Sequence, residues 1–211
     1  MISLDNRLRS VFDLFPSCRL AADIGADHGK LALALVTQGK AERIMVTDIS
    51  RDSLRKAEDL FAAHHASHLA EFLLGDGMTV LPRTPDAVSV CGMGGKTISG
   101  ILENGLRRIF GAELILSPHT EIPAVRRTVY RLGYHIADER CAIASRRFYI
   151  MITAKPGQEK ISEEETELGP CLYRHRDDPA VREYYLWRHK VLSVERNETS
   201  EKKARWYFEA L

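Results

Sequence analysis

A glycine-rich segment near the N-terminus, AADIGADHGK at residues 21–30, has the composition of a ligand-binding turn between a strand and a helix. In dinucleotide-binding folds the glycines of this turn let backbone N–H groups approach a pyrophosphate. Here Asp27 stands where that fingerprint has its second glycine. A carboxylate this close to a phosphate would be repelled by about 4 kcal/mol at an effective dielectric of about 20. The segment therefore disfavours a nicotinamide dinucleotide and favours a cationic ligand. The alternative is that Asp27 only caps the helix that begins near Gly29.

Two more carboxylates follow later strands. Asp48 ends the second predicted strand, 25 residues after Asp23, and Asp76 follows the third strand in the sequence GDGM. An acid after the second strand can accept both ribose hydroxyls of an adenosine, and Asp76 could meet the adenine amino group. Because ligands bind at the carboxyl ends of parallel strands, we expect Asp23, Gly25, Asp48 and Asp76 to share one site. S-adenosylmethionine fits this site, since it carries an ammonium and a sulfonium group and no phosphate.

Two segments after the fourth and fifth strands could form the substrate side of the same edge. The sequence CGMGGK contains three glycines that allow close approach to backbone, and Met93 offers an adaptable apolar contact. The sequence LSPHT brings His119 to the rim, where it could hydrogen-bond a substrate base or be an ordinary loop residue. The predicted substrate pocket consists of Gly94, Gly95, Ser117, Pro118 and His119.

Strands and helices alternate along the chain in the way that positions such a site. After an N-terminal helix, apolar strands at RLAADIG, RIMVTD, AEFLLGDG, DAVSVCG and AELILSP alternate with amphipathic segments, the second of which is capped by Ser50. Near-continuous apolar strands between helices indicate a doubly wound α/β fold with a parallel sheet. The segment YHIADERCAIASRRFYIMITAKP leaves no room for a helix, so its two strands should form an antiparallel hairpin. The sequence thus predicts the Rossmann-like, seven-stranded sheet of class I methyltransferases.

The C-terminal part differs in composition. We predict a methyltransferase domain at 1–155, a polar and acidic linker at 156–176, and a helical hairpin at 177–211. Its first helix should begin at Asp178 and Pro179 and run to about Arg196, and Thr199 or Ser200 should cap the second. A hairpin of this size must pack on the main domain or on a partner.

Composition excludes several classes of protein. The net charge of +1 argues against a globally basic nucleic-acid binder, and no long apolar run indicates a membrane span or a secretory signal. A cytoplasmic protein is expected. The four cysteines form no C-x-x-C pair, which is typical of reduced thiols. His64, His68 and Glu71 have a spacing seen in metal sites, but no fourth ligand is in view and no metal is expected.

The motifs ADIGADHGKL, GDGM, CGMGGKTISGIL and LILSPHTEIPAVRRTVYRLGYHI together resemble the TrmK family, bacterial tRNA adenine-N1 methyltransferases that modify the D-arm adenine at position 22. The resemblance covers nearly all of residues 1–155, and it implies that the C-terminal helices form a coiled-coil-like extension. It also implies S-adenosylmethionine as cofactor and tRNA as partner. The cofactor-binding residues it implies are Asp23, Gly25, Asp27, His28, Asp48, Asp76, Gly77, Gly92 and Met93.

Two residues are candidates for a catalytic role, Asp27 and His119, which could orient the exocyclic amine of the target base. Contacts to RNA phosphates are predicted for Arg126, Arg127, Arg131, Lys202 and Lys203. We expect a monomer or weak homodimer. Two alternatives stay open: a class I methyltransferase acting on a small molecule or protein, and a non-catalytic RNA-binding domain with a vestigial cofactor pocket.

Overall fold

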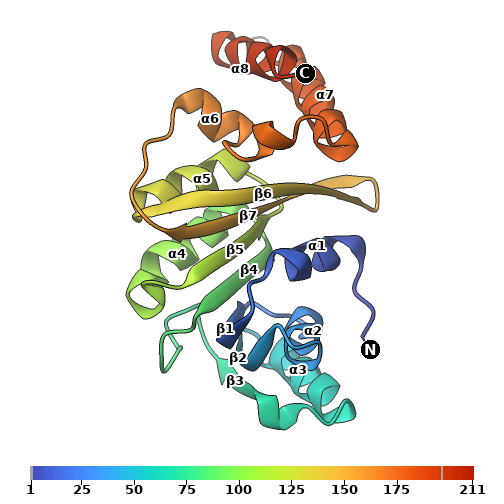
Figure 1. Cartoon of the computed structure of the whole chain (residues 1–211), viewed down its shortest axis with the longest axis vertical. Helices are drawn as coiled ribbons and strands as arrows, with labels where there is room; N and C mark the ends of the chain where they lie inside the picture. The colour runs from blue at the N-terminus through green and yellow to red at the C-terminus, as the bar shows by residue number, and fades with distance from the viewer. Residues whose placement is uncertain (1, 196) are drawn as a thin grey trace.

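The computed structural model describes residues 2–195 and 197–211, which form a seven-stranded mixed sheet with helices on both faces (Figure 1). The strands are β1 (Cys18–Ile24), β2 (Ala41–Asp48), β3 (Ala70–Leu74), β4 (Ala87–Met93), β5 (Glu113–Pro118), β6 (Tyr134–Ala144) and β7 (Arg147–Pro156). Their order in the sheet is β3-β2-β1-β4-β5-β7-β6. The first five strands pair in parallel, and β7 pairs antiparallel with both β5 and β6. This topology confirms the predicted class I methyltransferase fold.

The helices divide between the two faces of the sheet (Figure 1). One face is covered by α1 (Asn6–Leu14), α2 (Lys30–Thr37) and α3 (Arg51–Ala63), and the other by α4 (Gly95–Ile109) and α5 (Ile122–Arg131). Strand residues alternate between two apolar clusters with the period of two that a pleated strand imposes. In β5, Leu114 and Leu116 join the cluster beneath α4 and α5, whereas Ile115 joins the cluster beneath α2. Burial on both faces explains why these strands are almost continuously apolar.

Local chemistry sets the helix boundaries. Ser50 caps α3 as expected, since its hydroxyl accepts the Ser53 N–H. The first helix begins only after Asp5, whose carboxylate accepts the Leu8 N–H at 2.7 Å. The helix α4 continues through Gly105 to Ile109. Gly105 is buried within α4, where a Cβ atom would lie 2.5 Å from the Cβ of Met78.

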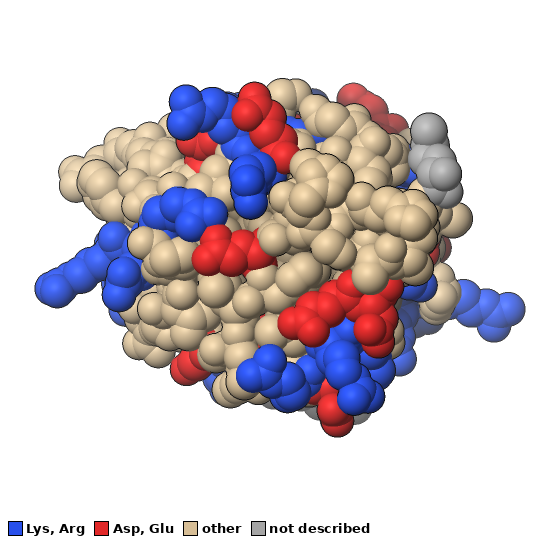
Figure 2. Space-filling view, turned by 90° about the horizontal axis from the view of Figure 1, so that it is seen from below, with Lys and Arg blue, Asp and Glu red and all other residues tan. Residues whose placement is uncertain are grey.

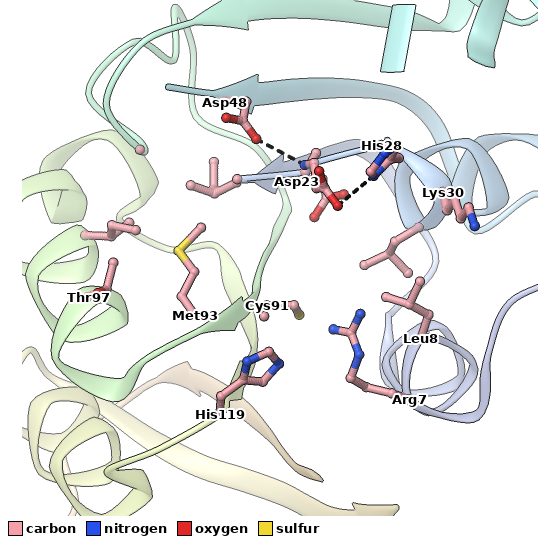
Figure 3. Close-up of a pocket in the computed structure, with 18 of the residues that line it drawn as sticks. Arg7, Leu8, Asp23, His28, Lys30, Asp48, Cys91, Met93, Thr97 and His119 are labelled. Carbon is pink, nitrogen blue, oxygen red and sulfur yellow. Dashed lines mark hydrogen bonds and ion pairs between the residues drawn. The ribbon is translucent and has the colours of Figure 1, made fainter. Parts of the chain in front are cut away.

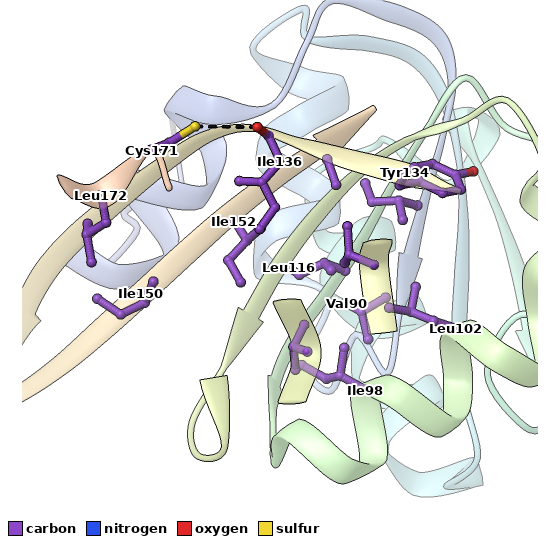
Figure 4. Close-up of a cluster of buried hydrophobic side chains, with 14 of the residues drawn as sticks. Val90, Ile98, Leu102, Leu116, Tyr134, Ile136, Ile150, Ile152, Cys171 and Leu172 are labelled. Atoms are coloured by element: carbon purple, nitrogen blue, oxygen red, sulfur yellow. Dashed lines mark hydrogen bonds between the residues drawn. The ribbon is translucent and has the colours of Figure 1, made fainter. Parts of the chain in front are cut away.

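The segment 156–176, expected to be a linker, folds back onto the sheet domain. It contains α6 (Glu163–Leu168), which is closed by a capping box between Ser162 and Glu165, and the short helix η2 (Leu172–His175). Leu172 is fully buried in the cluster that Figure 4 shows, and the Sγ of Cys171 lies 3.4 Å from the Ile136 carbonyl oxygen. The sequence predicts a linker here because the composition of the segment is polar and acidic, and its few buried apolar residues do not change that composition.

The C-terminal helices α7 (Pro179–Val194) and α8 (Glu198–Glu209) belong to the same core. Tyr185 and Tyr207 are fully buried, and their hydroxyls donate to the carbonyl oxygens of Leu168 and Glu167, both at 3.0 Å. Asp178 caps α7 as expected, whereas α8 is capped by Asn197 rather than by Thr199 or Ser200. Arg196, the expected end of the first helix, lies outside the described residues. The hairpin thus packs on the main domain, one of the two expected arrangements.

Charge is distributed evenly on the face of the molecule that Figure 2 shows, where Lys and Arg side chains are interspersed with Asp and Glu. This view looks along the sheet from its β3 end. Among the described residues, none of the helices has the length and apolar character needed to cross a membrane.

Candidate active site

A cavity of about 670 Å³ lies at the carboxyl ends of β1, β2 and β4, and Arg7 and Leu8 of α1 line one side of it (Figure 3). All nine residues predicted to bind the cofactor line this cavity. They come from the ends of four strands, β1 to β4, and the turns that follow them, which the parallel sheet brings to one edge. The structure therefore assembles the predicted set, and the role of each member stays a prediction.

The turn after β1 needs its first glycine. Gly25 has φ of +66°, and its N–H donates to the Thr47 carbonyl oxygen at 2.8 Å, which holds the turn against the end of β2. A Cβ atom at this position would lie 1.9 Å from the Cε of Met93, which also lines the cavity. The absence of a side chain at Gly25 therefore gives the methyl group of Met93 room beside the turn.

Asp27 does not cap α2, which removes the simpler explanation of its presence. The residue at the helix start is Gly29, and no side chain there bonds to the helix. Asp27 instead adopts φ of +50°, its N–H donates to Asp48 Oδ2 at 3.1 Å, and its carboxylate lies 2.7 Å from Nδ1 of His28. Asp27 lines the cavity, and its side chain is 69% exposed.

Asp23 is the buried acid of the site. It is 4% exposed, and the hydroxyl of Ser89 donates to its Oδ1 at 2.7 Å. Burial raises the pKa of Asp23 from 3.8 to about 6, against the lowering effects of Ser89 and Arg7. The carboxylate is therefore mostly ionised at neutral pH although solvation of its charge is poor. A cation bound beside it would supply the missing stabilisation.

Asp48 and Asp76 complete the acidic edge. Both oxygens of Asp48 accept backbone N–H groups, from Asp27 at 3.1 Å and from Ser50 at 2.8 Å, so the side chain is fixed at the end of β2. Asp76 is exposed and lies in the turn two residues beyond the end of β3. Both line the cavity, where the Asp48 carboxylate retains acceptor capacity for a ligand hydroxyl.

The predicted substrate pocket is assembled only in part. His119 lines the cavity, but Gly94, Gly95, Ser117 and Pro118 do not. Ser117 is fully buried within the sheet. Gly95 begins α4 and donates to the Thr120 carbonyl oxygen at 3.0 Å, and a Cβ there would lie 2.5 Å from that oxygen. Gly95, Ser117 and Pro118 are buried, and the assignment of all four residues as substrate contacts stays a prediction.

Arg7 is a site residue that sequence reasoning missed. It projects from α1 into the cavity and faces His119 (Figure 3), and its guanidinium lies 5.8 Å from the ring centroid of Tyr149. Burial lowers the pKa of His119, and Arg7 and Arg147 lower it further, so the imidazole is neutral at pH 7. A neutral imidazole can both donate and accept a hydrogen bond. No sequence signal distinguishes Arg7 from the other polar residues of an amphipathic helix.

The predicted RNA-contacting residues separate into two groups. Arg126 is fully buried, its Nε donates to Glu139 Oε1 at 2.8 Å, and its Nη1 donates to the carbonyl oxygens of Thr166 and Glu167. The RNA assignment of Arg126 is therefore wrong: this side chain ties α5 to β6 and α6. The other four are at least partly accessible, and three of them are in ion pairs, Arg131 with Glu103, Lys202 with Glu163 and Lys203 with Glu167.

No group of three or more potential metal ligands is found within residues 2–195 and 197–211. His64 and His68 lie at the end of α3 and in the following turn, and Glu71 pairs instead with Arg83 at 2.7 Å. All four cysteines are free thiols.

Comparisons with known proteins agree with this geometry. The family described as "Methyltransferase domain" matches residues 4–152. The tRNA (adenine(22)-N(1))-methyltransferase of Bacillus subtilis is 27% identical over 83% of this chain and 77% of its own length. The "Putative tRNA methyltransferase" of Mycoplasma pneumoniae is 31% identical over 77% of each chain.

Similar solved structures include Sp1610 of Streptococcus pneumoniae, crystallised in complex with S-adenosyl-L-methionine. It has a TM-score of 0.93 and 23% identity, and the alignment covers 99% of this chain and 100% of that one. The likeness extends through the C-terminal helices. This chain therefore belongs to the methyltransferase-domain family, and within it to the TrmK family that its motifs indicate.

Proposed function

We propose that this chain is an S-adenosylmethionine-dependent enzyme that transfers a methyl group to N1 of an adenine in the D-arm of tRNA. Membership of the family supports the reaction type, and the activity named for the Bacillus subtilis relative supports the substrate. The observation that carries the proposal is the cavity at the carboxyl edge of the sheet, which is lined by Asp23, Asp27, Asp48 and Asp76.

The donor set of this cavity fits the cofactor. The four carboxylates suit a ligand that bears positive charge and no phosphate, and the glycine turn allows that ligand to approach the backbone closely. Asp48 would accept the ribose hydroxyls, Asp76 and Gly77 would adjoin the adenine, and Asp23 and Asp27 would lie on the side of the cationic groups. When bound, the cofactor supplies an electrophilic methyl group.

The residues of the chain have mainly to position the target base. Adenine N1 carries a lone pair at neutral pH, so attack requires no prior deprotonation. Alignment of reacting atoms at roughly 3–3.5 Å can contribute about 7–11 kcal/mol. Because N1 lies on the pairing edge, the base must leave its stack, at a cost of a few kcal/mol. Neutral His119 and exposed Asp27 are the polar side chains placed to orient the exocyclic amine, and Arg7 borders the same space.

One experiment tests this function against its alternatives. The protein is incubated with labelled S-adenosylmethionine and unmodified tRNA, and the product nucleosides are mapped. We expect N1-methyladenosine at a single D-arm position. Label in protein or in a small molecule, with none in tRNA, would favour the small-molecule or protein methyltransferase. Binding of tRNA without transfer of label would favour the non-catalytic RNA-binding domain. A tRNA substrate would place the enzyme in the cytoplasm, and we propose a monomer or weak homodimer.

A further inference from the structure

A second cavity, of about 740 Å³, adjoins the cofactor cavity and shares His119 with it. Its walls come from three parts of the chain: the β6–β7 turn, the start of α5 and one side of α7. The C-terminal helices thus help to build a surface beside the reaction site. We call this second cavity the α7 groove.

One wall of the α7 groove is aromatic. The rings of Phe148 and Trp187 lie 5.4 Å apart at 34°, and those of Tyr184 and Trp187 lie 6.0 Å apart at 35°. Trp187 is 44% exposed, whereas Tyr184 behind it is buried. A partly exposed ring that is supported by other rings is suited to stacking with an unstacked nucleobase.

The α7 groove is also lined by basic residues. Arg146 and Arg147 lie at the tip of the β6–β7 hairpin, both are exposed, and neither is in an ion pair within the part of the chain that the structure describes. Arg188 also lines the groove but is bound to Glu167 at 2.7 Å. The acidic residue of the groove, Glu121, is paired with Lys96 at 3.2 Å and is thereby offset.

The backbone of this hairpin tip is strained. Ser145 and Arg146 have φ of +48° and +59°, the left-handed conformation that a two-residue turn with positive φ at both positions requires. Such turns favour Asn-Gly or Asp-Gly, so a serine and an arginine cost free energy here. The strained turn directs two consecutive arginines to the groove. Strain retained at one exposed turn is a reason to look for a ligand there.

We propose that the α7 groove binds the nucleotide that adjoins the target adenine in the RNA strand, with its base on Trp187 and Phe148 and its phosphate at Arg146 and Arg147. Aromatic rings beside unpaired arginines match the base and the phosphate of single-stranded RNA. The shared residue His119 places this nucleotide next to the one in the reaction site. This inference rests on the proposed function, since it requires an RNA substrate.

The first test measures affinity for an unmodified tRNA transcript in the presence of S-adenosylhomocysteine. Trp187→Ala should weaken binding about 5- to 150-fold, the effect of losing one stacked base. Leu186→Ala is the matched control, because Leu186 is exposed on the same helix and does not line the groove. Unchanged tRNA affinity in Trp187→Ala would overturn the proposal.

The second test measures the phosphate contacts. The double variant Arg146→Gln/Arg147→Gln should reduce the slope of log affinity against log salt concentration by about 0.7–0.9 for each arginine. Arg43→Gln, an exposed position near the opposite end of the parallel strands, should leave the slope unchanged. An unchanged slope in the double variant would contradict the assignment of the arginines.

A fluorescence measurement leaves Trp187 in place and so does not depend on how a Trp187 variant folds. In Trp206→Phe, Trp187 is the one remaining tryptophan, and its fluorescence should be quenched when unmodified tRNA binds. Absence of quenching at saturating tRNA would refute stacking on Trp187. These outcomes are distinct from failure of the proposed function. If the proposed function is wrong, the wild-type protein methylates no tRNA. If only the assignment of the α7 groove is wrong, every groove variant still methylates tRNA with an unchanged KM.

Discussion

Replacing Asp23 by asparagine should stabilise the folded protein at neutral pH and weaken binding of S-adenosylmethionine. Burial raises the pKa of Asp23 from 3.8 to about 6, so ionising this group costs the folded state more than the unfolded state. At about 1.36 kcal/mol for each pKa unit, the cost at pH 7.5 is about 3 kcal/mol. Asp23→Asn should remove most of it, because an amide keeps the shape and carries no charge.

The pH dependence gives the sign of the effect. Between the unfolded pKa of 3.8 and the folded pKa of about 6, the folded state binds more protons, so wild-type stability falls as pH rises through this range. Below pH 4 the carboxyl is protonated in both states and the advantage of the variant should disappear. Above pH 6 the advantage should be constant.

Urea unfolding of wild type and Asp23→Asn at pH 4 and pH 7.5 measures this difference, with Asp59→Asn on the exposed side of α3 as the control. Calorimetry on the same proteins should show cofactor affinity reduced roughly 30-fold or more in Asp23→Asn, as expected for loss of an attraction of about 2–4 kcal/mol. Equal stability of the two proteins at pH 7.5, or undiminished cofactor affinity in Asp23→Asn, would refute this account of the buried acid.

Three further predictions test other parts of the structure. Gly25→Ala and Gly39→Ala both place a side chain at positive φ, and each should lower the free energy of unfolding by about 1–2 kcal/mol. Only Gly25→Ala should abolish cofactor binding, because nothing lies within 4 Å of a Cβ at Gly39. Equal cofactor affinity in the two variants would contradict this prediction. Arg126→Gln should lower the free energy of unfolding by about 3–5 kcal/mol, because it leaves Glu139 buried and without its cationic partner. Loss of tRNA affinity without loss of stability would instead assign Arg126 a contact with RNA. His119→Ala should lower kcat about tenfold while S-adenosylhomocysteine affinity, measured by calorimetry, stays within about twofold; unchanged kcat would remove His119 from the site.

The sheet and the acidic edge could be predicted because both depend on local patterns. Strands such as β4 and β5 are apolar on both faces, so burial alone identifies them. Asp23 and Asp48 lie at or next to the ends of such strands, and a parallel sheet leaves no other place for them than a common edge. The turn at Gly25 follows from the same reasoning.

The remaining features depend on contacts between distant residues. Arg126 is a charged residue in a helix, and no local sequence pattern indicates that it forms a buried ion pair with Glu139 of β6. Arg7 reaches the cavity only because α1 packs beside it. The segment at 156–176 has an acidic composition, and its role in the core rests on Leu168, Cys171 and Leu172, too few to form a periodic pattern.

The most direct test of the central claim is titration calorimetry of the wild-type protein with S-adenosylmethionine, S-adenosylhomocysteine and NAD at pH 7.5. The acidic cavity around Asp23, Asp27 and Asp48 predicts binding of the first two compounds and no measurable heat from the third. Tight binding of NAD, with no binding of the sulfonium compound or its demethylated product, would contradict it.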